Sequence, residues 1–183
     1  MRRRTLFALL PILLALGAGI AVTGRDGAAP DASARTSGET GEAADASGPV
    51  QVVDGDTLRI GARRIRLHGI DAPERAQRCA GADGRPYSCG AQATEALTRL
   101  IGNGRPACAE RDRDRYGRSV AVCTLAGRDL NRAMVAAGWA VAYTRYSRDY
   151  EGDEAAARRA RRGVWQGGFE RPDQYRAERR GRG

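Results

Sequence analysis

The chain contains no lysine, so each of the 31 basic residues among its 183 is an arginine. It has one histidine, His68, and its four cysteines form no Cys-x-x-Cys pair, so the sequence gives little support to a zinc site. No internal repeat is visible either. The simplest expectation for the folded part is therefore a single small domain with one core.

Codon preference in a GC-rich genome can account for the choice of arginine over lysine, but it does not account for the excess of positive charge. The chain has 22 acidic residues, and its formal net charge is +9. Such a basic domain favours a polyanionic partner, either a nucleic acid or an anionic envelope surface.

The N-terminal segment has the pattern of an export signal. Met1 is followed by three arginines and then by an apolar run from Leu6 to about Val22. No Ala-x-Ala site directly follows the run and no nearby cysteine could accept a lipid, so residues 1–24 are either a signal peptide or an N-terminal membrane anchor. We therefore expect an exported protein, periplasmic or secreted, with a membrane tether if the segment is retained.

Three further regions follow the export signal. Residues 25–48 contain nothing large and apolar, which predicts a disordered linker because such a segment cannot bury enough surface to become ordered. Residues 49–175 carry the alternating and helical apolar patterns of a folded domain. Residues 176–183 are rich in arginine and glycine, and we expect them to form a basic, disordered tail.

The four cysteines are most naturally explained by two disulfides formed in an oxidising compartment. Cys108 and Cys123 lie in strand-like stretches joined by a turn, so a bridge between them would link neighbouring strands. Cys79 and Cys89 would close the loop that follows Glu74. Of the three possible connectivities, Cys79–Cys89 with Cys108–Cys123 is therefore favoured.

The apolar pattern predicts three short strands, a helix, a strand hairpin and two more helices. The first strands alternate with period two, and Asp54-Gly55 is a strong turn signal. The expected strands are 50–53, 57–60, 64–68, 107–111 and 119–125, and the expected helices begin near 90, 130 and 150. This order predicts an α+β, mainly β domain: a small closed antiparallel barrel with helices packed on it.

Three short motifs bring acidic and basic side chains to strand ends and turns. They are Asp54-Gly55-Asp56-Thr57, Arg66 followed by Asp71-Ala72-Pro73-Glu74, and Tyr116-Gly117-Arg118. Carboxylates bind a hard cation such as calcium, and arginine binds phosphate through a bidentate fork. A cation, a further carboxylate and two guanidiniums together suit the cleavage of phosphodiesters.

These motifs, in this order and spacing, resemble the thermonuclease family of staphylococcal or micrococcal nuclease-like domains. The resemblance covers roughly Val50 to Trp165 and extends to Asp114-Arg115, Leu130-Asn131, Ala137-Gly138-Trp139-Ala140 and Gly163-Val164-Trp165. It implies an OB-fold, that is, a five-stranded antiparallel barrel with three packed helices, which often binds single-stranded nucleic acid in a basic groove.

The resemblance also implies a role for each matching residue. The implied calcium ligands are Asp56, Asp71 and the backbone carbonyl of Ala72. The implied catalytic residues are Glu74, which positions or deprotonates the attacking water, and Arg66 and Arg118, which clamp the phosphate. The implied substrate contacts are Arg115, Tyr116, Tyr143 and Tyr146. For the tyrosines, simple packing remains an alternative.

The implied activity is that of a calcium-dependent, sugar-nonspecific nuclease acting on DNA and RNA, preferring single strands and leaving 3′-phosphate ends, with no need for more than a monomer. Two alternatives remain: a non-catalytic nucleic-acid-binding or interaction module of the same fold, and a structural envelope protein. The presence of all the acidic and arginine motif residues favours catalysis. The loop 75–90 departs from the family pattern, so the preference between DNA and RNA stays open.

Overall fold

The computed structural model describes residues 48–182. The predicted export signal and nearly all of the predicted linker lie outside this range. None of the helices among residues 48–182 combines the length and the apolar composition needed to cross a membrane.

The main sheet contains six strands: five follow the order β1-β2-β3-β8-β7, and the short β9 also pairs with β8. These strands are β1 Val50–Asp54, β2 Thr57–Ile60, β3 Arg63–Leu67, β7 Ala107–Arg113, β8 Ser119–Leu125 and β9 Arg128–Asp129. The first three form the predicted antiparallel meander, and β7 and β8 form the predicted hairpin. Two short pairs stand apart from this sheet: β4 Ile70–Asp71 with β10 Val141–Ala142, and β5 Cys79–Ala80 with β6 Pro86–Tyr87.

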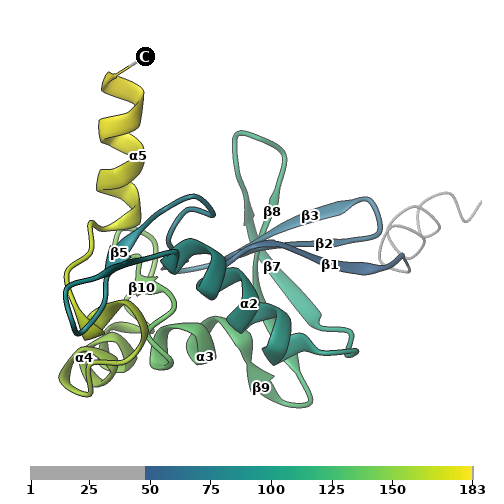
Figure 1. Cartoon of the computed structure of the whole chain (residues 1–183). Coiled ribbons are helices and arrows are strands. Elements are labelled where there is room, and N and C mark those ends of the chain that lie inside the picture. Colours follow the sequence, from purple (N-terminus) through teal and green to yellow (C-terminus); the bar gives the residue numbers. More distant parts are fainter. Residues whose placement is uncertain (1–47, 183) are drawn as a thin grey trace, which may run out of the picture. The chain divides into compact units, whose positions relative to one another are not determined.

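Three of the four described α-helices were expected from the sequence. They are α2 Cys89–Ile101, α3 Leu130–Ala136 and α4 Glu151–Arg159, and a short 3₁₀ helix, η1, covers Gly163–Gln166. The side chain of Asp129 accepts a hydrogen bond from the backbone N–H of Arg132, which confirms the predicted cap of α3. Helix α2 packs on β1, and α3 packs on β8 (Figure 1).

The structure corrects the predicted architecture in three respects. Strand β3 pairs with β8 in parallel, so the sheet is mixed rather than wholly antiparallel. Among the described residues no pairing joins β7 to β1, so closure of a barrel is not seen. A fourth helix, α5 Pro172–Gly181, covers most of the tail that was expected to be disordered. Proline at its first turn is compatible with a helix start, because that position needs no N–H partner.

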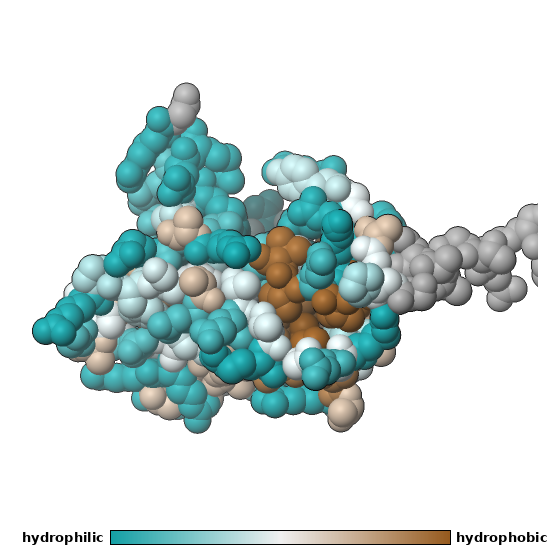
Figure 2. All heavy atoms as spheres, turned by 45° about the vertical axis from the view of Figure 1, so that its right-hand side comes forward, coloured by the Kyte–Doolittle hydropathy of each residue, from teal (hydrophilic) through white to brown (hydrophobic). Residues whose placement is uncertain are grey.

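The core lies between the meander and helices α2 and α3. Its fully buried large side chains include Leu58, Ile65 and Leu67 from the sheet, with Leu97 and Met134 from the helices. Hydrophilic residues cover most of the face seen in Figure 2, where hydrophobic atoms gather in one patch.

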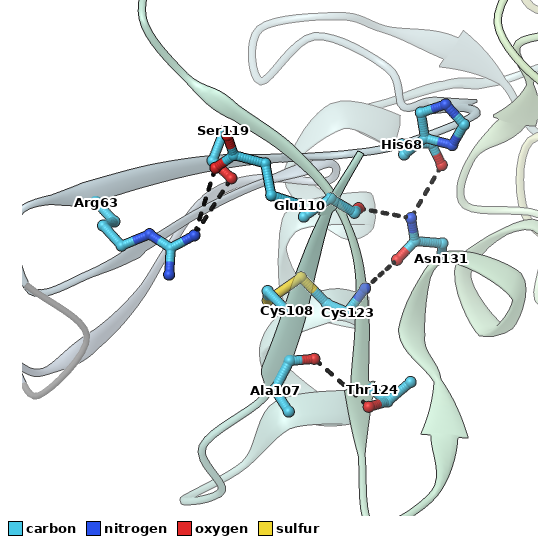
Figure 3. The surroundings of a disulfide bond; sticks show 10 residues. Arg63, His68, Ala107, Cys108, Glu110, Ser119, Cys123, Thr124 and Asn131 are labelled. Atoms are coloured by element: carbon cyan, nitrogen blue, oxygen red, sulfur yellow. Dashed lines mark hydrogen bonds and ion pairs between the residues drawn. A yellow bond between two sulfur atoms is a disulfide. The ribbon is translucent and has the colours of Figure 1, made fainter. Parts of the chain in front are cut away.

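Both predicted disulfides are present, Cys79–Cys89 and Cys108–Cys123. The second joins directly paired residues of β7 and β8 (Figure 3). Beside it, the buried side chain of Asn131 accepts from the N–H of Cys123 and donates to the carbonyl of His68, so it ties α3 to both β8 and the end of β3 (Figure 3). Two structural disulfides are typical of proteins that fold in an oxidising, extracytoplasmic compartment.

Candidate active site

The first acidic motif forms a tight turn between β1 and β2. The side chain of Asp54 accepts the N–H of Asp56 at 3.0 Å, and this bond shapes the turn. A Cβ at Gly55 would lie 2.7 Å from the Cβ of Ala72, so only glycine allows the two motifs to approach this closely. The turn therefore places Asp56 against the loop that carries the second motif.

Arg66 joins the first motif to the second. The register of β2 and β3 pairs Thr57 with Arg66, which brings the guanidinium beside Asp56. Its Nη1 donates to Oδ1 of Asp56 at 3.1 Å, and its Nη2 donates to Oδ1 of Asp71 at 2.7 Å. The backbone N–H of Ala72 completes the contact by donating to Oδ2 of Asp56 at 2.9 Å.

Both carboxylates of this cluster are withdrawn from water. Asp56 is 4% exposed and Asp71 is fully buried. Burial raises the pKa of Asp56 to about 7, and the nearby Asp54 and Asp71 add to this effect, while Arg66 and the N–H of Ala72 oppose it. Burial also works to lower the pKa of Arg66, but the two carboxylates raise it overall. Arg66 by itself therefore supplies one positive charge to two buried carboxylates.

The third carboxylate, Glu74, is connected to the cluster by an arginine that the sequence did not reveal as a site residue. Nη1 of Arg176 donates to Oε1 of Glu74 at 2.8 Å and to Oδ1 of Asp71 at 3.0 Å, and its Nη2 donates to Oδ2 of Asp71 at 2.8 Å. Burial works to lower the pKa of Arg176, but the hydrogen bonds to both carboxylates raise it. Arg176 lies on α5, within the segment that was expected to be a disordered tail.

The turn that carries Glu74 is held in place by the fully buried side chain of Gln77. The side-chain oxygen of Gln77 accepts the N–H of Glu74, and its amide group donates to the carbonyl of Glu170 at 2.7 Å. The N–H of Gly90, at the start of α2, donates to the carbonyl of Gln77. A Cβ at Gly90 would lie 1.8 Å from the carbonyl oxygen of Glu74, so α2 begins directly against this turn.

Arg118 lies in the turn that directly precedes β8, and within residues 48–182 no hydrogen bond or ion pair joins it to the acidic cluster. It directly precedes Ser119, which pairs with Ile65 in the parallel β3–β8 register, so it lies beside the strand that carries Arg66. Its Nε donates to Oδ2 of Asp114 at 2.7 Å. Burial works to raise the pKa of Asp114, but hydrogen bonds from Arg118 and from the loop backbone lower it.

The four predicted substrate contacts form two groups at the surface, in which Tyr143 is half-buried and the other three are exposed. Tyr116 is 69% exposed at the tip of the β7–β8 hairpin, with the guanidinium of Arg115 4.9 Å from its ring centre. Tyr143 and Tyr146 meet edge to face with ring centres 4.9 Å apart, and Tyr146 is 60% exposed. The N–H of Tyr143 donates to the carbonyl of Gly69, so this second group follows the β10 strand that pairs with β4.

The chemistry of the donor set fits a hard cation. Asp56 and Asp71 are close enough to share one guanidinium, and carboxylate oxygens are the ligands that calcium prefers. The described residues do not contain three acidic, histidine or cysteine side chains already gathered as a metal site. The third carboxylate, Glu74, is instead bridged to Asp71 by Arg176.

Comparison with known proteins identifies the family to which this chain is similar. Residues 64–167 match the family described as staphylococcal nuclease homologue. The chain is 40% identical over 105 residues to the succinoglycan biosynthesis protein ExoI of Rhizobium meliloti (strain 1021), which covers 56% of this chain and 55% of that protein. It therefore spans about half the length of ExoI.

Two further relatives are named as nucleases. An uncharacterized endonuclease of Escherichia coli O157:H7 is 35% identical over 123 residues, covering 63% of this chain and 74% of the relative. The micrococcal nuclease of Shigella flexneri is 31% identical over 133 residues, covering 63% and 71%. The family match begins after Asp56 and ends before α5, so Arg176 lies outside it.

Proposed function

This chain belongs to the staphylococcal nuclease homologue family, and from that membership and its acidic cluster we propose that it is a calcium-dependent, sugar-nonspecific nuclease. Its substrates would be DNA and RNA, preferably single-stranded, and its products would end in 3′-phosphate. The observation that carries the proposal is the convergence of Asp56 and Asp71 on Arg66, with Glu74 at its edge. The named endonuclease relatives agree with this chemistry.

Each group of the cluster suits one part of phosphodiester hydrolysis. Asp56, Asp71 and the carbonyl of Ala72 would hold the calcium ion. When bound there, the ion would neutralise part of the negative charge that builds on the phosphate oxygens. Glu74, whose side chain is 39% exposed, is accessible enough to accept a proton from an attacking water.

The two arginines would stabilise the phosphate from β3 and from the turn before β8. The parallel pairing sets Arg66 opposite Val120, two residues beyond Arg118. Within residues 48–182 a carboxylate engages Arg118 only at Nε, so its two Nη groups can face a phosphate. Fixed donors of this kind act where charge develops in the transition state.

The exposed aromatic residues would bind the flanking nucleotides. Tyr116 with Arg115, and the Tyr143–Tyr146 pair, would offer aromatic rings to unpaired bases. Stacking of a base on an aromatic ring contributes about 1–3 kcal/mol and tolerates any sequence. This arrangement supports a preference for single strands.

The proposal is tested by digesting single-stranded DNA and RNA with the full chain, in calcium and in excess chelator. We expect cleavage only with calcium, and end-group analysis should find 3′-phosphate. Glu74→Gln should bind a nucleotide bisphosphate as well as the wild type and cut at least a hundredfold more slowly. The matched control is Glu95→Gln, because Glu95 is an exposed residue of α2 that pairs with Arg99 of the same helix.

Two outcomes would contradict this function. Cleavage that survives the chelator would remove calcium from the mechanism, and equal cleavage by wild type and Glu74→Gln would remove Glu74. Tight binding of single strands without any cleavage would instead support the non-catalytic binding module.

A further inference from the structure

We propose that helix α5 is an inhibitory latch, in which the guanidinium of Arg176 occupies the acidic cluster until a divalent cation displaces it. The inference rests on the proposed function, since it assigns a control element to the same site. It concerns a part of the chain that lies beyond the family match at residues 64–167.

The contacts of Arg176 fall on the two groups that the reaction needs free. Both oxygens of Asp71 accept from Arg176, and Oδ1 of Asp71 also accepts from Arg66. A cation that uses Asp71 as a ligand must compete for these same oxygen atoms. Oε1 of Glu74 also accepts from Arg176, so a water that uses this oxygen must share it with the guanidinium or displace it.

The charge of the cluster explains why the latch closes in the absence of a cation. Three carboxylates, Asp56, Asp71 and Glu74, meet two guanidiniums, Arg66 and Arg176. A fully buried carboxylate such as Asp71 is costly without a partner, so Arg176 supplies charge that a divalent cation would otherwise provide. Two such positive groups at the same oxygens repel each other, so binding of the cation and closure of the latch are mutually opposed.

The way α5 is attached allows it to move without disturbing the domain. Only Pro172 is buried in this helix, and Figure 1 shows the helix projecting from the rest of the fold. The anchoring contacts precede it: Arg171 donates to Glu154 and to the carbonyl of Ala142, and Gln77 donates to the carbonyl of Glu170.

Apart from Arg176, the later part of α5 makes contacts within the helix and a side-chain hydrogen bond between Glu178 and Glu170, which precedes the helix. Arg179 donates to the hydroxyl of Tyr175, and Arg182 pairs with Glu178, four residues apart in each case. The bonds of Arg176 are therefore the principal hold of the helix on the cluster. Once they break, a helix of ten residues has little stability of its own in water.

The test measures calcium affinity by titration calorimetry and hydrogen exchange of the amides in residues 173–181, both with the full chain. In the wild type, saturating calcium should speed this exchange at least tenfold. Arg176→Gln should exchange fast with or without calcium, and it should bind calcium at least tenfold more tightly. Arg180→Gln is the matched control, because Arg180 is an exposed arginine of the same helix, and it should behave as the wild type.

A second variant guards against a loss of folding in Arg176→Gln. Arg176→Lys keeps the positive charge but lacks the bidentate fork, so its calcium affinity should lie between those of the wild type and Arg176→Gln. The latch is overturned if calcium leaves the exchange of α5 unchanged, or if both variants bind calcium no more tightly than the wild type. It is also overturned if Arg176→Gln cuts more slowly at saturating calcium, since Arg176 would then serve catalysis.

Failure of the proposed function looks different from failure of the latch. If no variant cuts nucleic acid while calcium still binds and releases α5, the nuclease assignment fails and the latch stands. If the wild type cuts with calcium, but calcium does not change the hydrogen exchange of α5 and the Arg176 variants do not change the calcium affinity, the latch fails and the nuclease assignment stands.

Discussion

The two disulfides should contribute similar stability but have different effects on activity. In the chain-entropy description, the stabilisation by a bridge grows with the logarithm of the loop length, and the loops here span 10 residues for Cys79–Cys89 and 15 for Cys108–Cys123. These lengths correspond to about 2.7 and about 3.0 kcal/mol at 25 °C. Replacing either pair by alanine should therefore lower the free energy of unfolding by about 3 kcal/mol.

The difference in activity follows from what each bridge holds. Cys89 is the first residue of α2, and the N–H of the next residue, Gly90, donates to the carbonyl of Gln77. The side chain of Gln77 in turn accepts the N–H of Glu74. Cys108–Cys123 instead joins β7 to β8 near the end of the hairpin that is opposite to the turn with Arg118. Loss of the first bridge should loosen Glu74 and lower the cleavage rate at least tenfold, whereas loss of the second should change the rate less than about twofold while the domain stays folded.

The assay combines urea unfolding of the two double-alanine variants with initial cleavage rates at a temperature where both remain folded. Equal rates for the two variants would refute the link between the 79–89 bridge and Glu74. A variant whose stability matches that of the wild type would refute the contribution assigned to its bridge.

Two further predictions concern the arginines of the site. Arg66→Met leaves the buried Asp56 and Asp71 without the guanidinium that they share. It should lower the free energy of unfolding by about 3–5 kcal/mol, measured by urea titration in calcium-free buffer. A loss below about 1 kcal/mol would show that the two carboxylates do not depend on Arg66. Asp114→Asn removes the charged partner of Arg118 and should slow cleavage about tenfold with little change in melting temperature, and an unchanged rate would show that this contact does not position Arg118.

The elements that the sequence predicted correctly have local signals. Asp129 caps α3 through its own side chain, and Asp54-Gly55 forms a turn whose geometry depends on adjacent residues. The Cys108–Cys123 disulfide could also be predicted from the sequence, because the two cysteines lie on the two strands of one hairpin. In each case the interaction spans few residues or follows from the periodicity of one element.

The features that sequence reasoning missed depend on contacts between distant parts of the chain. The parallel pairing of β3 with β8 joins Ile65 to Ser119, and nothing in either strand specifies the direction of its partner. Gln77 reads as an ordinary polar loop residue, yet it is fully buried between Glu74 and Glu170. Pro172 could have signalled a helix start, but no local signal directs Arg176 of that helix to Asp71.

Folding and chemistry place opposite demands on Asp71. A fully buried carboxylate must be paired for the domain to be stable, whereas a metal ligand must have oxygen atoms free. Arg66 alone satisfies the first demand only in part, because it is shared with Asp56. An exchangeable partner such as Arg176, supplied from a helix with little other attachment, can meet the first demand without permanently blocking the second.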